Sequence, residues 1–416
     1  MRDDKIEVGL LTVLLCSVLT SATAVPSIVG YVFVVVVYGI VLSVCYLRGM
    51  LAVRYDRVLL YPIVALWIIF LISLIRYPTS ATLLRTAAFI VFTGINLFVL
   101  PATFSKRQFI DALSLIASVV TGITVPIAIP ALLAGTEGIG VWDVNQGTPV
   151  LASIFTNPNQ LATLSVFGVV ALFGFARTKR RQRWAISGVL FCLVGLAVSQ
   201  GRAALLALVG AFILILSYWF DGTRATTGVV ALGIIGGIAI VALAVGLVPD
   251  SFLPSGFFTN RSGLWAATLR AIDARPALGW GLVEGAPVIE QFGAPTPGGH
   301  TPGVHNSYLR MFLNVGVLGG ELYLIVCAVV LIRAIQSLQH NISSNVDYII
   351  LPLLAVALTL QLFEPSTIFG LSMASTIEAM IFGFAQRPER TIPISSVMVD
   401  LAAKTGLRSH RSKLSR

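Results

Sequence analysis

Apolar stretches long enough to cross a lipid bilayer recur along nearly the whole chain, and they constrain the fold most strongly. A helix needs about 20 apolar residues to cross about 30 Å of hydrocarbon. With 56% hydrophobic and 11% charged residues, the 416-residue chain lacks the charged surface of a soluble protein of this size. The sequence therefore predicts an all-α, polytopic membrane protein with about twelve transmembrane helices, at residues 8–24, 28–47, 58–75, 81–104, 109–134, 160–176, 184–200, 203–220, 227–248, 307–332, 347–363 and 367–385.

The distribution of basic residues predicts the orientation of these helices. With the N-terminus in the cytoplasm, 21 Lys and Arg lie on the inner side, five lie on the outer side and two lie within predicted spans. Because basic residues accumulate on the cytoplasmic side, we expect both termini there, and residues 135–159, 201–202 and 249–306 outside. The membrane orientation then accounts for the net charge of +10, and we expect no nucleic-acid partner. The same charge predicts contacts between the basic tail 387–416 and membrane lipids.

The sequence predicts a single transmembrane domain, at residues 1–386, followed by this tail. Residues 22–24 resemble a signal-peptidase site, but acidic residues precede the first apolar stretch, so cleavage of residues 1–24 stays open. The sequence contains no cluster of His and Cys and no carboxylate pair with metal-ligand spacing. We therefore expect neither a metal ion nor a cofactor.

The outer loop 249–306 holds most of the soluble backbone and predicts a short amphipathic helix at 260–276. Its apolar residues repeat at helical spacing: Leu264, Trp265, Thr268, Leu269 and Ile272. This helix is expected to lie flat on the membrane, with Trp265 at the depth of the lipid headgroups. The Gly- and Pro-rich residues that follow it are expected to form flexible turns that close over a ligand.

Three side chains on the predicted outer face are the candidate catalytic residues. His305 lies where the long loop meets an apolar segment, a position that favours chemistry over packing. Arg202 lies in a tight outer turn and Arg261 at the start of the amphipathic segment. A guanidinium can clamp phosphate oxygens, although a contact with lipid headgroups explains either arginine equally well. We expect the histidine to be oriented by one of four outer carboxylates, Glu137, Asp143, Glu284 and Glu290.

Five further polar residues are candidate substrate-binding groups. Asn306 and Arg310 lie one helical turn apart, directly after the histidine. Asn157 and Asn159 form a turn that caps the next helix, and they can also hydrogen-bond a sugar or a phosphate. Arg85 lies ~7 Å below the outer surface, where it either reaches the headgroups or lines the floor of an outward cavity.

Five motifs occur in an order that resembles the O-antigen ligase and polymerase family, membrane glycosyltransferases of bacterial surface polysaccharides. They are NPNQLATL (157–164), SQGRAALLAL (199–208), RSGLW (261–265), PALGWG (276–281) and HNSYLRMFLNVGVLGG (305–320). The resemblance covers residues 150–335, and the HNSYL-type segment after a long outer loop is its most specific element. It implies a GT-C-like fold in the inner membrane.

The resemblance also implies an activity: metal-independent, inverting transfer of glycan from a polyprenyl (undecaprenyl) diphosphate carrier to a sugar hydroxyl. The acceptor would be a glycan or a lipid-linked sugar, and the active site would face outward. By position, Arg202 and Arg261 match the family's essential arginines and His305 its essential histidine. Ligase and polymerase share these motifs, so the sequence does not choose between them. The alternatives are a transporter or flippase for polysaccharide or lipid-linked oligosaccharide, which should show repeat symmetry, and an assembly subunit.

Overall fold

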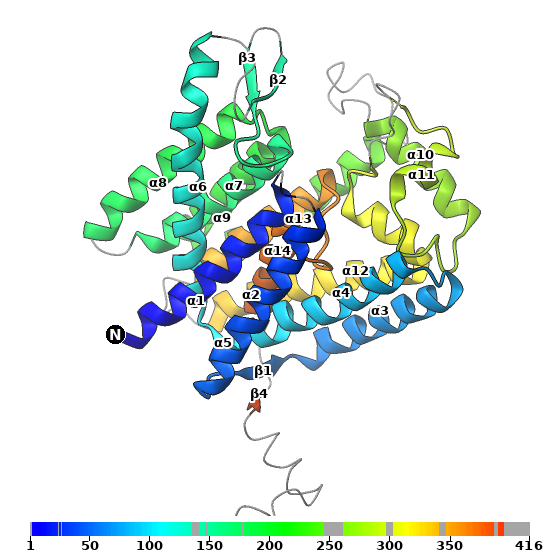
Figure 1. Ribbon diagram of the computed structural model, residues 1–416, viewed down its shortest axis with the longest axis horizontal. Coiled ribbons are helices and arrows are strands. Elements are labelled where there is room, and N and C mark those ends of the chain that lie inside the picture. Colours follow the sequence, from blue (N-terminus) through cyan, green and yellow to red (C-terminus); the bar gives the residue numbers. More distant parts are fainter. Residues whose placement is uncertain are drawn as a thin grey trace, which may run out of the picture.

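The computed structural model describes residues 2–23, 25, 27–134, 141–145, 148–176, 179–244, 261–296, 303–340, 347–386 and 390–394. Glu137, residues 249–260 and 297–302 of the outer loop, and most of the tail 387–416 lie outside these ranges. The described chain is almost entirely helical (Figure 1).

Except at residues 367–372, the start of the predicted span 367–385, the described parts of the predicted apolar segments are covered by helices. They are α1 (Arg2–Leu19), α2 (Ser27–Leu47), α3 (Arg57–Arg76), α4 (Ser80–Gly94), α5 (Leu100–Thr103), α6 (Lys106–Ala134), α7 (Pro158–Phe175), α8 (Lys179–Val198), α9 (Arg202–Ala244), α12 (Ser307–His340), α13 (Asp347–Phe363) and α14 (Met373–Ala385). A 3-10 turn, η1 (Thr20–Ala22), follows α1, and a π-helical turn, η2 (Ile95–Val99), joins α4 to α5. The outer loop adds α10 (Arg261–Ala274) and α11 (Gly285–Glu290).

Nine of the described helical segments are long and apolar enough to cross a membrane. Two shorter apolar helices, Tyr348–Phe363 and Met373–Ala385, accompany them. These findings confirm an all-α integral membrane protein. They do not confirm the predicted number of twelve spans.

Helix α9 contains two of the predicted spans, although its 43 residues form one continuous helical assignment. Gly222, near its middle, has a left-handed φ of 60°. The Ser217 hydroxyl donates to Oγ1 of Thr226 at 3.4 Å, whereas nine residues of straight helix would separate them by about 13 Å. The chain therefore reverses at Gly222, and two spans result, Arg202–Phe220 and Gly222–Ile240.

The connection between α13 and α14, residues 364–372, is irregular and deeply buried; we call it the deep loop. The Thr93 hydroxyl, in the middle of the span Ser80–Thr103, donates to the carbonyl of Ile368 at 3.3 Å. Phe369 stacks on Phe89 and packs edge-on against Phe70. Irregular backbone at membrane depth persists only where protein surrounds it, because its polar groups need partners there.

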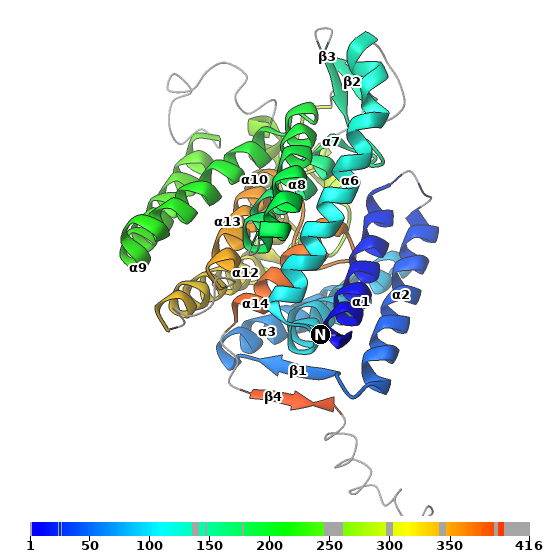
Figure 2. The same ribbon diagram turned by 90° about the vertical axis from the view of Figure 1, so that its left-hand side faces the viewer.

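Segments predicted to share a membrane face lie together. Strand β1 (Ala52–Tyr55) pairs antiparallel with β4 (Arg390–Pro393), and both were predicted to be cytoplasmic (Figure 2). On the predicted outer face, Thr23 forms a β-bridge with Phe155, near the hairpin of β2 (Val141–Asn145) and β3 (Thr148–Leu151). These contacts agree with the predicted grouping of the loops.

The outer loop is fastened to the ends of the spans by a second core. Its buried apolar residues come from α10, α11, α12 and α13, and they include Leu264, Trp265, Ile289, Leu309 and Phe363. The predicted amphipathic helix is therefore present. The expectation for Trp265 is wrong: its side chain is fully buried, and its indole N–H donates to the carbonyl of Val304 at 3.1 Å. The apolar face of α10 meets protein, so this ring contacts protein and not lipid headgroups.

Candidate functional site

The site begins at the N-terminus of α12. Asn306 caps this helix, because its Oδ1 accepts from the backbone N–H of Leu309 at 2.9 Å. Its Nδ2 donates to the carbonyl of Leu362 at 3.0 Å, and the side chain is only 1% exposed. Both polar groups of Asn306 are thus used to hold the start of α12 against the end of α13. His305 directly precedes this cap in a left-handed conformation, with φ 47°. Non-glycine residues rarely adopt it outside turns and functional sites.

The deep loop lies beneath the first turn of α12. The Ser307 hydroxyl donates to the carbonyls of Glu364, at 2.7 Å, and Ser366. The Arg310 guanidinium donates to the carbonyl of Pro365 at 2.8 Å. These bonds satisfy carbonyl groups of the irregular segment and fix its depth relative to His305.

Glu364 joins helices that are far apart in sequence. Its Oε1 accepts from Nδ2 of Asn159, in the first turn of α7, at 2.9 Å. The same oxygen lies 3.5 Å from Nη2 of Arg261, the first residue of α10. The Arg261 guanidinium also lies over the Phe363 ring, 5.6 Å from its centroid. The carboxylate and the arginine are only 14% and 22% exposed, so this ion pair is largely shielded from water.

Burial controls the protonation of this cluster. Desolvation, together with the positive charge of Arg261, lowers the pKa of His305 to about 4. The imidazole is therefore neutral at physiological pH, and its Nδ1 is buried without a hydrogen-bond partner in the described structure. Desolvation raises the pKa of Glu364 to about 7, against the opposing effects of Arg261 and Asn159. Burial also lowers the pKa of Arg261. A neutral base thus lies beside a cation and a carboxyl group that titrates near neutrality.

The Gly-rich segment after α10 is packed into a kink of α12, which corrects the prediction of flexible turns for its described part. Gly316 interrupts α12 with φ 74° and ψ −174°, which frees carbonyls of the preceding turn. The backbone N–H groups of Trp280 and Gly281 donate to the carbonyls of Leu313 and Asn314, each at 2.8 Å. A Cβ at Gly279 would lie 2.5 Å from the Leu313 carbonyl oxygen. The Gly-rich segment and α12 therefore pack so closely that only glycine fits at this position.

Arg85 is tied to the outer loop. Its guanidinium donates to the carbonyl of Leu282 at 3.1 Å and forms an ion pair with Glu284 at 2.8 Å. Arg85 and Glu284 both interact electrostatically with Arg310, so Arg85 lies at the edge of the site. The Glu284 carboxylate thus pairs with Arg85 and does not orient the histidine. Glu290 is exposed at the end of α11.

Arg202 lies outside this contact network, and Asn157 joins it only through Asn159. Arg202 is exposed at the start of α9 and forms no hydrogen bond or ion pair with any other residue that the structure describes. Its neighbour Ala203 packs against the core beneath α10, which places Arg202 on the same face of the molecule. Asn157 is the N-cap of α7, as the sequence predicted, and accepts from the backbone N–H of Asn159 at 2.8 Å.

Glu364 is the site residue that sequence reasoning missed. Its only local signal is a charged residue followed by proline between two apolar segments. Its partners lie 205 and 103 residues away, and a single sequence does not show such distances in space. Within the described residues, no group of three His, Cys, Asp or Glu side chains comes together as a metal site would require.

Residues 187–324 match the family model of the O-antigen ligase, and this segment contains Arg202, Arg261 and His305. No curated protein matches the chain at a significant level. The match confirms the resemblance to the O-antigen ligase and polymerase family. It covers about a third of the chain and supports a membrane glycosyltransferase of this type.

Proposed function

From a family match that spans the histidine and both arginines, we propose that this protein transfers glycan from a polyprenyl diphosphate carrier to a sugar hydroxyl. The product is either a ligated glycan or a lengthened, lipid-linked polymer. The active unit is the transmembrane domain 1–386 in the inner membrane, with both termini cytoplasmic and the site facing outward. The observation that carries the proposal is the convergence of His305, Arg261 and Glu364 at one end of the helices.

In this reaction the acceptor hydroxyl attacks the anomeric carbon while the bond to the diphosphate oxygen breaks. The neutral imidazole of His305 takes the hydroxyl proton, which its lowered pKa permits at any pH above about 4. The diphosphate departs as an anion and needs no proton. Attack opposite to the leaving group inverts the anomeric centre, and the positive charges supplied by the protein replace a metal ion.

The arginines hold the departing diphosphate. Arg261 lies closest to the histidine, and its partial burial strengthens its interaction with an anion. Arg202 has no partner among the described residues and can turn toward the donor from α9. Loss of one such donor typically costs 10²–10³ in rate. Arg85, Arg310, Asn157 and Asn159 surround these groups and contact the sugar or the carrier, while Asn306 keeps the histidine in place.

The test uses purified protein, a polyprenyl-diphosphate glycan, candidate acceptors and a chelator, with products identified by mass spectrometry. Arg261→Ala, Arg202→Ala and His305→Ala should each lower transfer by about 10² or more. Arg270→Ala is the matched control on α10, because among the described residues Arg270 hydrogen-bonds only the carbonyl of Phe292. His300→Ala controls for the histidine. Full transfer by two of the three variants, or turnover that the chelator abolishes, contradicts the proposal.

A further inference from the structure

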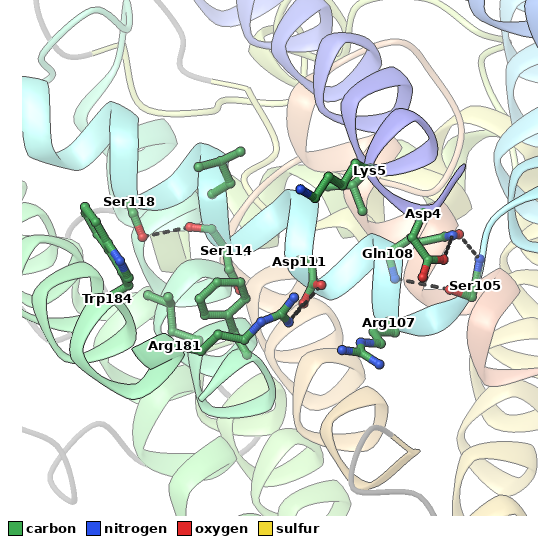
Figure 3. Close-up of a pocket in the computed structure, with 14 residues that line it drawn as sticks. Asp4, Lys5, Ser105, Arg107, Gln108, Asp111, Ser114, Ser118, Arg181 and Trp184 are labelled. Atoms are coloured by element: carbon green, nitrogen blue, oxygen red, sulfur yellow. Dashed lines mark hydrogen bonds and ion pairs between the residues drawn. The ribbon is translucent and has the colours of Figure 1, made fainter. Parts of the chain in front are cut away.

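A cavity of about 390 Å³ is lined by residues of α1, α6, α7 and α8 (Figure 3). It lies at the end of α7 opposite to the candidate site. Helix α7 connects the two places. Asn159 in its first turn contacts Glu364, whereas Phe175 at its last turn lines the cavity. Helical rise separates these two residues by about 24 Å. The mouth of the cavity is formed by segments predicted to be cytoplasmic, so it opens at the inner leaflet.

One basic side chain of the cavity is held in place. Nη1 of Arg181 lies 3.1 and 3.3 Å from the two carboxylate oxygens of Asp111, which is only 8% exposed. The Arg181 guanidinium also lies over the Phe175 ring, 5.0 Å from its centroid. These contacts hold the positive charge of Arg181 at a defined place beside the cavity, which suits a phosphate group.

Two further basic side chains approach the same place. Lys5 and Arg107 are exposed and line the cavity, and in the parts of the chain described neither has a hydrogen bond or an ion pair. Figure 3 shows Lys5 above and Arg107 below Asp111. Asp4 also lines the cavity, where it accepts from Nε2 of Gln108 at 3.4 Å. The charged lining residues, three basic and two acidic, carry one net positive charge, which balances the single negative charge of a phosphodiester.

The deeper wall of the cavity is apolar and open to lipid. Leu115 of α6 is 49% exposed and Trp184 of α8 is 70% exposed. Tryptophan favours the membrane–water interface, where its ring lies beside headgroups and upper acyl chains. A soluble anion would bind the basic mouth alone. A phospholipid would bind both surfaces, its headgroup at the basic mouth and its acyl chains along the apolar wall.

We propose that this cavity binds an anionic phospholipid of the inner leaflet. Its phosphodiester lies between Lys5, Arg107 and Arg181, and its acyl chains run along Leu115 and Trp184. The site is distinct from the proposed glycan-transfer site and does not depend on it.

The experiment measures binding of phosphatidylglycerol to the full-length protein in neutral detergent by native mass spectrometry. Each basic residue near a membrane surface contributes about 1 kcal/mol, so Lys5→Gln/Arg107→Gln should bind roughly 30-fold more weakly. Arg48→Gln/Arg224→Gln is the matched control, since it removes the same charge from the same predicted face away from the cavity. Unchanged affinity in the cavity variant, or an equal loss in the control, overturns the proposal. Competition by inorganic phosphate at concentrations equal to the lipid assigns the site to a soluble anion and also overturns it.

A second measurement needs no charge variant. Brominated lipids quench nearby tryptophan, and the difference between wild type and Trp184→Phe isolates the signal of this ring. Brominated phosphatidylglycerol should quench Trp184 more strongly than brominated phosphatidylcholine at the same mole fraction. Equal quenching by the two lipids contradicts a specific headgroup site.

Discussion

Replacement of Glu364 by glutamine should remove a pH dependence from the stability of the protein. Burial raises the pKa of this carboxyl group from its ordinary 4.5 to about 7. The native protein therefore keeps a proton that the unfolded chain releases between these two values. Because the unfolded state binds fewer protons in this window, the free energy of unfolding falls as the pH rises from about 4.5 to 7, and it levels off above 7. Each tenfold change in proton affinity is worth about 1.4 kcal/mol, so the full effect is roughly 3 kcal/mol.

The assay is thermal unfolding of purified protein in detergent at pH values from 5 to 8, followed by intrinsic fluorescence. Wild-type protein should lose melting temperature relative to Glu364→Gln as the pH rises, because glutamine keeps the shape and cannot ionise. Glu284→Gln is the control, since the Glu284 side chain is 73% exposed in its pair with Arg85. A difference between wild type and Glu364→Gln that stays constant from pH 5 to 8 would refute the assignment of a raised pKa.

Three further predictions follow from the same contacts. Gly316→Ala should lower the melting temperature and the yield of folded protein, because Gly316 has a positive φ and a Cβ there would lie 2.4 Å from the Ala277 carbonyl oxygen. Gly210→Ala is the control in the same thermal assay, because a Cβ at Gly210 would meet nothing within 4 Å. Protonation of His305 should not slow glycan transfer between pH 8 and 5, because the pKa of its imidazole is about 4. A pH–rate profile whose acid limb near pH 6.5 disappears in His305→Gln would contradict this. Trp265→Phe should destabilise the protein by about 1 kcal/mol through loss of its hydrogen bond to Val304, measured as a lower melting temperature, and an unchanged melting temperature would disprove it.

Hydrophobic periodicity and charge distribution predicted the helices and the grouping of the loops because both depend on local sequence and on the bilayer. The reversal at Gly222 agrees with a short polar stretch between two apolar ones. The predicted N-cap at Asn157 is likewise local, since its side chain accepts a hydrogen bond from a backbone N–H two residues ahead. Such features need no knowledge of distant partners.

The failures concern contacts between distant segments. The Gly-rich residues after α10 have the composition of a flexible loop, yet they fill a kink whose carbonyls belong to Leu313 and Asn314. Trp265 lies on an amphipathic helix, and the same pattern fits a membrane surface or a protein core. Glu364 stands in a short connection that only the fold brings to Arg261 and Asn159. In each case local chemistry allowed several environments, and tertiary packing selected one.

The pairing of Glu364 with Arg261 has a consequence for how a diphosphate enters the site. The carboxylate occupies one side of the guanidinium that the proposed reaction needs, so an anionic donor must compete with it. Were the pKa of Glu364 at its ordinary value, the approaching donor would meet a fixed negative charge in a poorly solvated place. A pKa of about 7 changes this balance, because one proton neutralises the carboxyl group at little cost near neutrality. The carboxyl group then still accepts the hydrogen bond from Asn159, while Arg261 turns its charge to the phosphate. We therefore expect donor binding to take up a proton near pH 8, and proton release on donor binding would argue against this exchange.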